Sequence, residues 1–262
     1  MLDTQSPFLS SGAPDTVAIT EDKLKYAIIS GALAPCERLS EIEVCRDYRV
    51  GRGIVRAALG RLAHSGFVSS QPRSGWKVAS ISAIGLREVI LGRRQLEPLL
   101  GDVELSSDEL MRLETLSNMH AALAAAQAQG LGEDIVSARR YDRQIRHLLT
   151  MNMKAPLIAG WLENLWDKSD RYLAFMEAKG GSKLPVTDWS AFVEAKRSGG
   201  TIAATAFLTE ACEAFARFTQ TRFLESDASA VASPTKKSKA APGTDLSATV
   251  LNRSETNPKR TS

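Results

Sequence analysis

Apolar residues recur every three or four positions near the start of the chain, which is the spacing of amphipathic helices. The pattern predicts three helices in succession, over residues 16–30, 41–48 and 52–64. Gly31 ends the first, Ser40 is a favourable N-cap for the second, and Gly66 follows the third. Residues 33–39 are expected to form a loop. The first part of the chain should therefore contain three short helices.

The periodicity then changes to the alternation and composition that are typical of β-strands. Residues 67–70 and 76–78 predict two short strands, and residues 71–75 between them are turn-forming, with Arg73 at the tip. Three helices followed by a β-hairpin make a winged helix-turn-helix, which we assign to residues 16–80.

Beyond residue 82 the strand signals cease and helical periodicity returns. Six helices are predicted, over residues 86–100, 107–129, 133–152, 156–178, 187–198 and 202–223. Their short connections favour an antiparallel bundle within residues 82–225. Residues 1–15 are expected to be a flexible leader, and residues 226–262, rich in Ser, Thr, Ala, Lys and Pro, a disordered tail. The predicted fold class is mainly α: an N-terminal winged helix-turn-helix plus a C-terminal all-α antiparallel helical bundle.

Composition narrows the class of protein. The chain has 262 residues, of which 44% are hydrophobic, so it can bury the core of one or two domains. Three scattered cysteines, Cys36, Cys45 and Cys212, argue against a disulfide framework. Residues 1–20 lack the basic start and apolar run of a secretory signal, and no stretch approaches the ~18–20 apolar residues of a membrane span. We expect a soluble cytoplasmic protein that does not contact a membrane.

Positive charge gathers around the predicted third helix. The formal net charge is only +3, but residues 21–80 hold ten basic and six acidic residues, and residues 48–64 hold four arginines and no acid. Arg52 and Arg56 lie one turn apart on one helical face. The residues expected to face the core are Ile54, Val55, Ala58, Leu59 and Leu62. Such a helix suits a polyanion, although two arginines alone are more often ordinary surface residues.

The same region resembles the DNA-binding domain of GntR-type bacterial transcription regulators. The resemblance covers residues 23–78, and the spacing agrees throughout. The matching segments are Ile28 to Pro35, Leu39-Ser40-Glu41, Val50 to Leu59, Arg61-Leu62, Gly66-Phe67-Val68 and Pro72 to Val78. Within this pattern, DNA contact becomes the stronger interpretation of the two arginines.

The resemblance implies a role for each basic residue. Arg52 and Arg56 would contact guanine edges and phosphates in the major groove. Phosphate contacts that set the register are expected from Arg49, Arg73 and Lys77. Gly75 would let the wing backbone approach the minor groove closely, but a plain hairpin turn explains a glycine there nearly as well.

Four residues, at three places, depart from the family pattern. Cys36 stands where a glycine usually follows the loop proline, and Gly51 stands where a serine usually precedes the first recognition arginine. Gly53-Ile54 replace a Thr-Pro pair. A serine hydroxyl would cap the recognition helix or touch a phosphate. We therefore expect a looser helix start and an altered DNA affinity or sequence preference.

The helical remainder resembles the effector-binding domain of the FCD, or fatty-acid-regulator, branch of that family. The likeness rests on helix order and on the run from Arg93 to Glu97. Many such domains hold a divalent metal through an Asp, a His four residues later and two further His. The chain has only three histidines, His64, His120 and His147, and the first belongs to the DNA-binding domain. A three-histidine site cannot be built, so we predict neither a metal nor a cofactor.

Asp142 matches the aspartate of that motif, but Arg146 stands four residues later and His147 is one step off the same face. Arg146 could point inward, where it would pair with Asp142 or bind an effector carboxylate bidentately. Alternatively, Arg146 is exposed and His147 faces the bundle. Of Arg93 and Arg94, one is expected to reach the effector while the other is solvated. The candidate effector-binding residues are Arg93, Arg94, Asp142, Arg146, His147 and Trp189.

These expectations combine into one interpretation. The chain would be a ligand-responsive transcription regulator, acting as a repressor, whose homodimer binds a pseudo-palindromic double-stranded DNA operator. The effector would be a small organic acid. One alternative is an effector-independent DNA-binding dimer whose ligand site has decayed. The other is an enzyme in the helical part, which is disfavoured because the sequence shows no nucleophile–base pair in a recognisable context and no phosphate-binding glycine loop.

Overall fold

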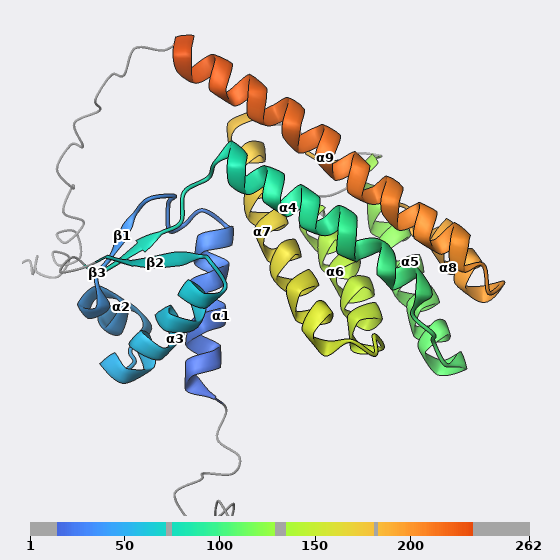
Figure 1. Cartoon of the computed structure of the whole chain (residues 1–262), viewed down its shortest axis with the longest axis horizontal. Helices are drawn as coiled ribbons and strands as arrows, with labels where there is room; N and C mark the ends of the chain where they lie inside the picture. Colours follow the sequence, from blue (N-terminus) through green and yellow to red (C-terminus); the bar gives the residue numbers. More distant parts are fainter. Residues whose placement is uncertain (1–14, 72–74, 129–134, 181–182, 233–262) are drawn as a thin grey trace, which may run out of the picture.

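A computed structural model describes residues 15–71, 75–128, 135–180 and 183–232. The chain folds into an N-terminal domain with three helices and a small sheet, followed by a helical domain (Figure 1). The mainly α fold class and the two-part architecture are as the sequence predicts. The expected leader over residues 1–14 and most of the expected tail, residues 233–262, lie outside the described residues.

The N-terminal domain follows the predicted order with one added strand. Its elements are α1 (Thr16–Ile29), β1 (Arg38–Leu39), α2 (Glu41–Tyr48), α3 (Arg52–His64), β2 (Val68–Gln71) and β3 (Gly75–Val78). The antiparallel sheet has the order β1-β3-β2. Its core joins α1, α3 and the sheet through the fully buried Leu24, Leu59, Leu62 and Phe67. Helix α3 is thus fixed by one apolar face.

Local chemistry explains the helix ends. Asp15 caps α1, because its Oδ1 accepts a hydrogen bond from the backbone N–H of Val17 at 3.0 Å. Gly31 and Gly66 follow α1 and α3 with φ of +81° and +80°, a left-handed conformation that favours glycine. Ser40 occupies the N-cap position of α2, but its side chain forms no capping hydrogen bond among the described residues. The expected Ser40 cap is therefore wrong in its chemistry, although the helix boundary is right.

The expected loop over residues 33–39 ends in a strand instead. Arg38 and Leu39 form β1, which pairs with Lys77 and Trp76 of β3. Two residues carry no detectable periodicity, so only pairing with a distant strand could reveal this element. The addition places β3 in the middle of the sheet.

The helical domain begins with α4 (Ala83–Leu96) and the 3₁₀-helix η1 (Glu97–Asp102). The remaining elements are α5 (Ser107–Ala128), α6 (Ile135–Met151), α7 (Pro156–Gly180), α8 (Ser190–Arg197) and α9 (Thr201–Ala232). The predicted helix over residues 86–100 is thus divided, because Pro98 cannot donate the hydrogen bond that would continue α4. Helix α9 continues past residue 225, where the sequence predicts that the tail begins.

Two apolar clusters hold the helical domain together. Trp189, Phe192 and Phe207 meet with ring centroids 5.2–5.6 Å apart and join α8 to α9. Tyr172 and Phe215 belong to a second cluster that joins α4, α7 and α9. Figure 1 shows α4 and α9 running side by side along one edge of this domain, with α6 and α7 beneath them. Within the described residues, none of the helices is long and apolar enough to cross a membrane.

The two domains meet along α7. The Arg171 guanidinium donates a hydrogen bond to the carbonyl of Ala79, just after the wing. The Tyr172 hydroxyl donates to the carbonyl of Ser82 at 2.9 Å. About one turn earlier on α7, Asp167 Oδ2 lies 3.3 Å from Lys25 Nζ of α1. Helix α7 therefore contributes to the core of the helical domain and also contacts the N-terminal domain.

Candidate functional site

Helix α3 presents two arginines on the face opposite its buried side. Arg52 is the first residue of the helix and is exposed, and the Arg56 side chain, one turn later, is 67% exposed. Val55, Leu59 and Leu62 on the other face are fully buried. The exposed face therefore carries positive charge without contributing to the core, as a surface that reads a polyanion requires.

Glu41 ties this surface together. Its Oε2 accepts a hydrogen bond from Arg56 Nε at 2.8 Å, and its Oε1 accepts one from Trp76 Nε1 at 3.2 Å. Burial by itself raises the pKa of Glu41, but the hydrogen bonds from Arg56 and Trp76 outweigh it, and the net pKa lies below its ordinary value. An ionised Glu41 thus links α2, α3 and β3. Sequence reasoning missed this residue, because its partners lie 15 and 35 positions away.

The remaining predicted DNA contacts lie around this surface. Arg49 caps α2 in a left-handed conformation, with φ of 55°, and is exposed. Lys77 is half-buried on β3, opposite Ser69 and Arg38. Gly75 has φ of +82°, and a Cβ there would lie 3.1 Å from the carbonyl oxygen of Leu39. The backbone alone thus requires this glycine. Arg73 lies outside the described residues.

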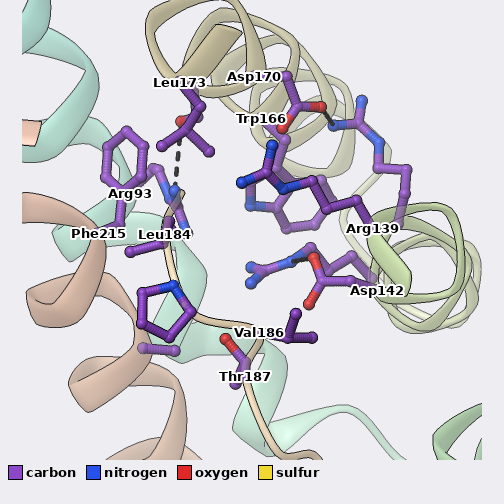
Figure 2. A pocket seen from close by; sticks show the side chains of 15 residues that line it. Arg93, Arg139, Asp142, Trp166, Asp170, Leu173, Leu184, Val186, Thr187 and Phe215 are labelled. Carbon is purple, nitrogen blue, oxygen red and sulfur yellow. Dashed lines mark hydrogen bonds and ion pairs between the residues drawn. The ribbon is translucent and has the colours of Figure 1, made fainter. Parts of the chain in front are cut away.

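A small cavity of about 80 Å³ opens in the helical domain between α4, α6, α7, α9 and the segment before α8. Four arginines line it, Arg93 from α4 and Arg139, Arg143 and Arg146 from α6. In Figure 2, Arg139 and Asp142 enter from one side, while Leu173, Leu184 and Phe215 lie on the other. A basic wall that faces an apolar wall fits a small organic anion with a short apolar part.

A buried carboxylate organises the basic wall. The Glu97 side chain is 0% exposed, and its Oε2 accepts hydrogen bonds from Arg93 Nε at 2.7 Å and Trp166 Nε1 at 3.2 Å. Arg146 Nη1 donates to Glu97 Oε1. A buried charge is tolerated only when it is paired, and here one carboxylate has two guanidinium partners. Glu97 therefore fixes both Arg93 and Arg146.

Asp142 lies on the opposite side of Arg146. Its Oδ2 accepts from Arg146 Nε at 2.8 Å, and its Oδ1 accepts from Trp189 Nε1 at 2.8 Å. Burial raises the pKa of Asp142 to about 6, although the hydrogen bond from Trp189 opposes the shift. Burial, followed by the charge of Arg93, lowers the pKa of Arg146 to about 9. Arg146 is further held between two indole rings, with its guanidinium 5.5 Å from Trp166 and 5.2 Å from Trp189.

Arg139 and Arg143 are more exposed, and both pair with carboxylates of α7. Arg139 forms a bidentate ion pair with Glu177, at 2.8 and 2.5 Å. Arg143 Nη2 lies 2.5 Å from Asp167 Oδ1 and 3.1 Å from Glu163 Oε2. Arg143 Nη1 is buried and has no hydrogen-bond partner among the described residues, because Asp170 Oδ2 is 3.6 Å away. Arg143 Nη1 therefore forms no hydrogen bond at the cavity, although it stays in ion-pair range of Asp170.

The arrangement does not suit a metal cation. In the part of the chain that the structure describes, no group of three or more His, Cys, Asp or Glu side chains could hold one. Arg146 stands where the resemblance to the FCD branch would predict a histidine, and a guanidinium offers no lone pair and repels a cation. The residues present thus favour an anion over a metal.

Comparison with known proteins shows which family the N-terminal domain resembles. Residues 17–78 match the family described as "Bacterial regulatory proteins, gntR family". The chain is 32% identical over 88 residues to the "Uncharacterized HTH-type transcriptional regulator YdhC" of Bacillus subtilis (strain 168), a match that covers 34% of this chain and 38% of that protein. Residues 17–78 are therefore a domain that matches the gntR family, and the match does not extend to the rest of the chain.

Solved structures support the same fold for the rest of the chain. The match to Escherichia coli McbR/YncC covers 80% of this chain and 100% of the McbR/YncC chain, with a TM-score of 0.67 and 21% sequence identity. A putative GntR transcriptional regulator from Rhodococcus sp. RHA1 covers 79% of this chain and 99% of its own, with a TM-score of 0.60 and 21% identity. At this identity the likeness shows the fold alone. The gntR-family domain is thus followed by a helical domain of known architecture, and its assignment to the FCD branch stays a prediction.

The structure separates the candidate effector residues. Arg93 lines the cavity, whereas the exposed Arg94 pairs with Glu213 at 2.7 Å. Arg146 is buried, and His147 is not among the lining residues: its side chain is 61% exposed, with Nδ1 3.1 Å from Glu163 Oε1. Of the two arrangements left open by the sequence, the inward arginine is therefore found, and an inward His147 is not. Trp189 is fully buried behind Asp142 and supports the cavity without lining it.

Proposed function

We propose that this gntR-family protein is a ligand-responsive transcription regulator of the cytoplasm, and that its homodimer binds a pseudo-palindromic operator. One α3 of each protomer would enter a major groove, with Arg52 and Arg56 at the base edges. Glu41 would position Arg56, and Arg49, Arg73 and Lys77 would hold phosphates. The proposal rests on the exposed basic face of α3 within a matched gntR-family domain.

The ligand would be a small organic acid. Arg143 Nη1 is the donor available for its carboxylate, and Leu173, Leu184 and Phe215 would cover a short apolar end. A cavity of about 80 Å³ admits only a small molecule. The ligand changes DNA affinity only if it binds one arrangement of the two domains more tightly than the other. The mode that we favour is repression that the acid relieves.

One observation favours a second candidate, an effector-independent DNA-binding dimer. Arg93, Arg139 and Arg146 already have carboxylate partners within the chain, so the basic wall is largely neutralised. A site of this kind can persist for stability after ligand binding is lost. The named relatives are transcription regulators, and we propose no catalytic activity for either candidate.

One experiment tests the proposal and separates the two candidates. The purified chain is used to select binding sites from a random duplex library, and the selected DNA is then titrated with and without a panel of small mono- and dicarboxylates. We expect a two-fold symmetric site, and at least one acid that changes the affinity about 5–150-fold. A selected site without any response to acids, and no thermal stabilisation by them, would support the effector-independent dimer. Failure to enrich any sequence would overturn both candidates.

A further inference from the structure

Asp167 is bound to both halves of the molecule at once. Its Oδ1 lies 2.5 Å from Arg143 Nη2 of the cavity, and its Oδ2 lies 3.3 Å from Lys25 Nζ of the N-terminal domain. The three side chains are only 17–28% exposed, so salt screens these interactions less than it screens surface pairs. One carboxylate is thus shared by a cation from each domain.

The surroundings of Asp167 leave the N-terminal domain room to move. Arg171 and Tyr172 hold the residues that join the domains, about one turn further along α7. On the other side of Asp167, a groove of about 580 Å³ separates α1 and α3 from α7. Its walls include Gly60 of α3 and Gly160 of α7, and a Cβ at either would meet no described atom within 4 Å. The Lys25–Asp167 pair therefore lies between a fixed junction and an open groove.

We propose that Asp167 couples occupation of the cavity to the placement of the gntR-family domain. The inference deepens the proposed function and rests on it for the identity of the ligand. A carboxylate at Arg143 Nη1 shares the guanidinium charge with Asp167, which is bound at Nη2, and draws the side chain toward the cavity. As Arg143 turns to the ligand, the charge of Asp167 becomes fully available to Lys25, and α1 docks more firmly on α7.

Other charged groups at this junction set the limits of the coupling. Glu163 also contacts Arg143, and it is held in turn by His147 and by Thr150 Oγ1 at 2.9 Å. These contacts hold Glu163 beside Arg143, although Glu163 also lines the groove that Lys25 lines; among the described residues, Lys25 pairs with Asp167. Arg139, which lines the same cavity, pairs with Glu177 instead of a residue bound to the N-terminal domain. Arg143 is therefore the coupling arginine, and Arg139 is its matched control.

Amide hydrogen exchange on the full-length protein without ligand tests the coupling directly. The readout is protection of α1, compared for the wild type and the variants Arg143→Gln, Arg139→Gln, Lys25→Met, Asp167→Asn and Arg143→Gln/Asp167→Asn. We expect Arg143→Gln to raise the protection of α1 severalfold, and Lys25→Met and Asp167→Asn to lower it. Arg139→Gln should leave α1 unchanged. In the Asp167→Asn background, Arg143→Gln should have no further effect.

The coupling is overturned if Arg143→Gln leaves α1 unchanged in the wild type or acts equally with and without Asp167. A second arm adds oxalate and follows its binding by the fluorescence of Trp166 in the cavity wall. Oxalate should raise α1 protection in the wild type, and should still bind to Asp167→Asn without that effect. An equal rise in both proteins overturns the coupling. If no acid binds, the proposed ligand response fails, whereas the ligand-free comparison still decides the role of Asp167.

Discussion

Arg146 and His147 are adjacent in the chain, yet a helical rotation of about 100° gives them opposite environments. Arg146 is held by Glu97, Asp142 and two indole rings, whereas the His147 side chain is 61% exposed. Periodicity alone could not choose between them, because either residue can terminate an amphipathic face. The choice is made by Glu97, whose buried charge requires a second guanidinium.

This difference predicts unequal stability losses. Replacing Arg146 by Met leaves Glu97 with one guanidinium partner, and breaking a buried pair in this way costs about 3–5 kcal/mol of the free energy of unfolding. Replacing His147 by Ala removes an exposed contact with Glu163 and should cost below about 1 kcal/mol. Urea denaturation of the two variants measures both values. Equal losses would show that the Arg146 network does not stabilise the helical domain.

Asp142 makes acid binding depend on pH. Its ordinary pKa of 3.8 is raised to about 6 by burial, so the carboxyl is mostly neutral at pH 5 and ionised at pH 7.5. At the lower pH, an anion in the cavity is therefore not repelled by a negative charge on Asp142. Oxalate, which remains ionised at pH 5, should therefore bind severalfold more tightly at pH 5 than at pH 7.5 in a tryptophan-fluorescence titration.

Asp142→Asn is the control for this pH effect, because the amide does not titrate. The variant should lose most of the difference between the two pH values. A small remainder is expected from Asp170, which also lines the cavity and whose pKa burial raises. A pH dependence identical to that of the wild type would exclude Asp142 as its source.

The same cavity chemistry predicts a protein without a bound metal. A guanidinium at position 146 cannot donate a lone pair, and neither Trp189 nor His147 replaces the missing ligands. Elemental analysis of the purified chain should find zinc, nickel and manganese well below one equivalent per protomer. A stoichiometric amount of any of them would refute the assignment of this cavity to anions.

Among the elements, α3 combines a buried apolar face with a first turn that has no side-chain cap. Gly51 is its N-cap residue and Gly53 lies in its first turn, so neither provides a capping side chain or a preference for helix. The first turn is nevertheless regular, with the Val55 N–H donating to the Gly51 carbonyl at 3.1 Å, so the looser start stays a prediction. The backbone at both residues is ordinary, in contrast to Gly75, where φ is +82°.

Two glycine substitutions should therefore have opposite signs. Gly53→Ala adds a methyl group that meets no described atom within 4 Å, and should raise the free energy of unfolding by about 0.5–1 kcal/mol. Gly75→Ala forces a Cβ to within 3.1 Å of the Leu39 carbonyl in a left-handed conformation, and should lower it by about 1–2 kcal/mol. Chemical denaturation checks both. A stabilising Gly75→Ala would contradict the observed wing backbone.

Sequence periodicity predicts nearly every helix, because each has an apolar face longer than two turns. It misses β1, which exists only through pairing with β3, and it joins α4 to η1 although Pro98 marks the division. The candidate sites follow the same rule. Arg52 and Arg56 stand out through local spacing, and Arg146 through the resemblance to the FCD branch. The i,i+4 spacing of Arg93 and Glu97 was available as a further signal. Asp167 could not be found, since its partners lie on α1 and α6.

At the scale of the whole molecule, α7 connects two surfaces that the sequence presents separately. It lines the arginine-lined cavity through Trp166 and Leu173, and it contacts the N-terminal domain through Asp167 and the residue after the wing through Arg171. A ligand that changes one surface therefore has a short physical route to the other. Ligand-responsive regulation requires first that α3 reads DNA.

Fluorescence anisotropy with the selected DNA measures that dependence. Arg52→Ala and Arg56→Ala are compared with the wild type and with Arg217→Ala, which removes a similarly exposed arginine, 63% accessible, from α9. Each bidentate arginine–guanine contact contributes about 1–3 kcal/mol, so both α3 variants should weaken specific binding about tenfold or more, with unchanged circular dichroism. Arg217→Ala should bind as the wild type does. Wild-type affinity in both α3 variants would contradict the assignment of α3 as the DNA-reading helix.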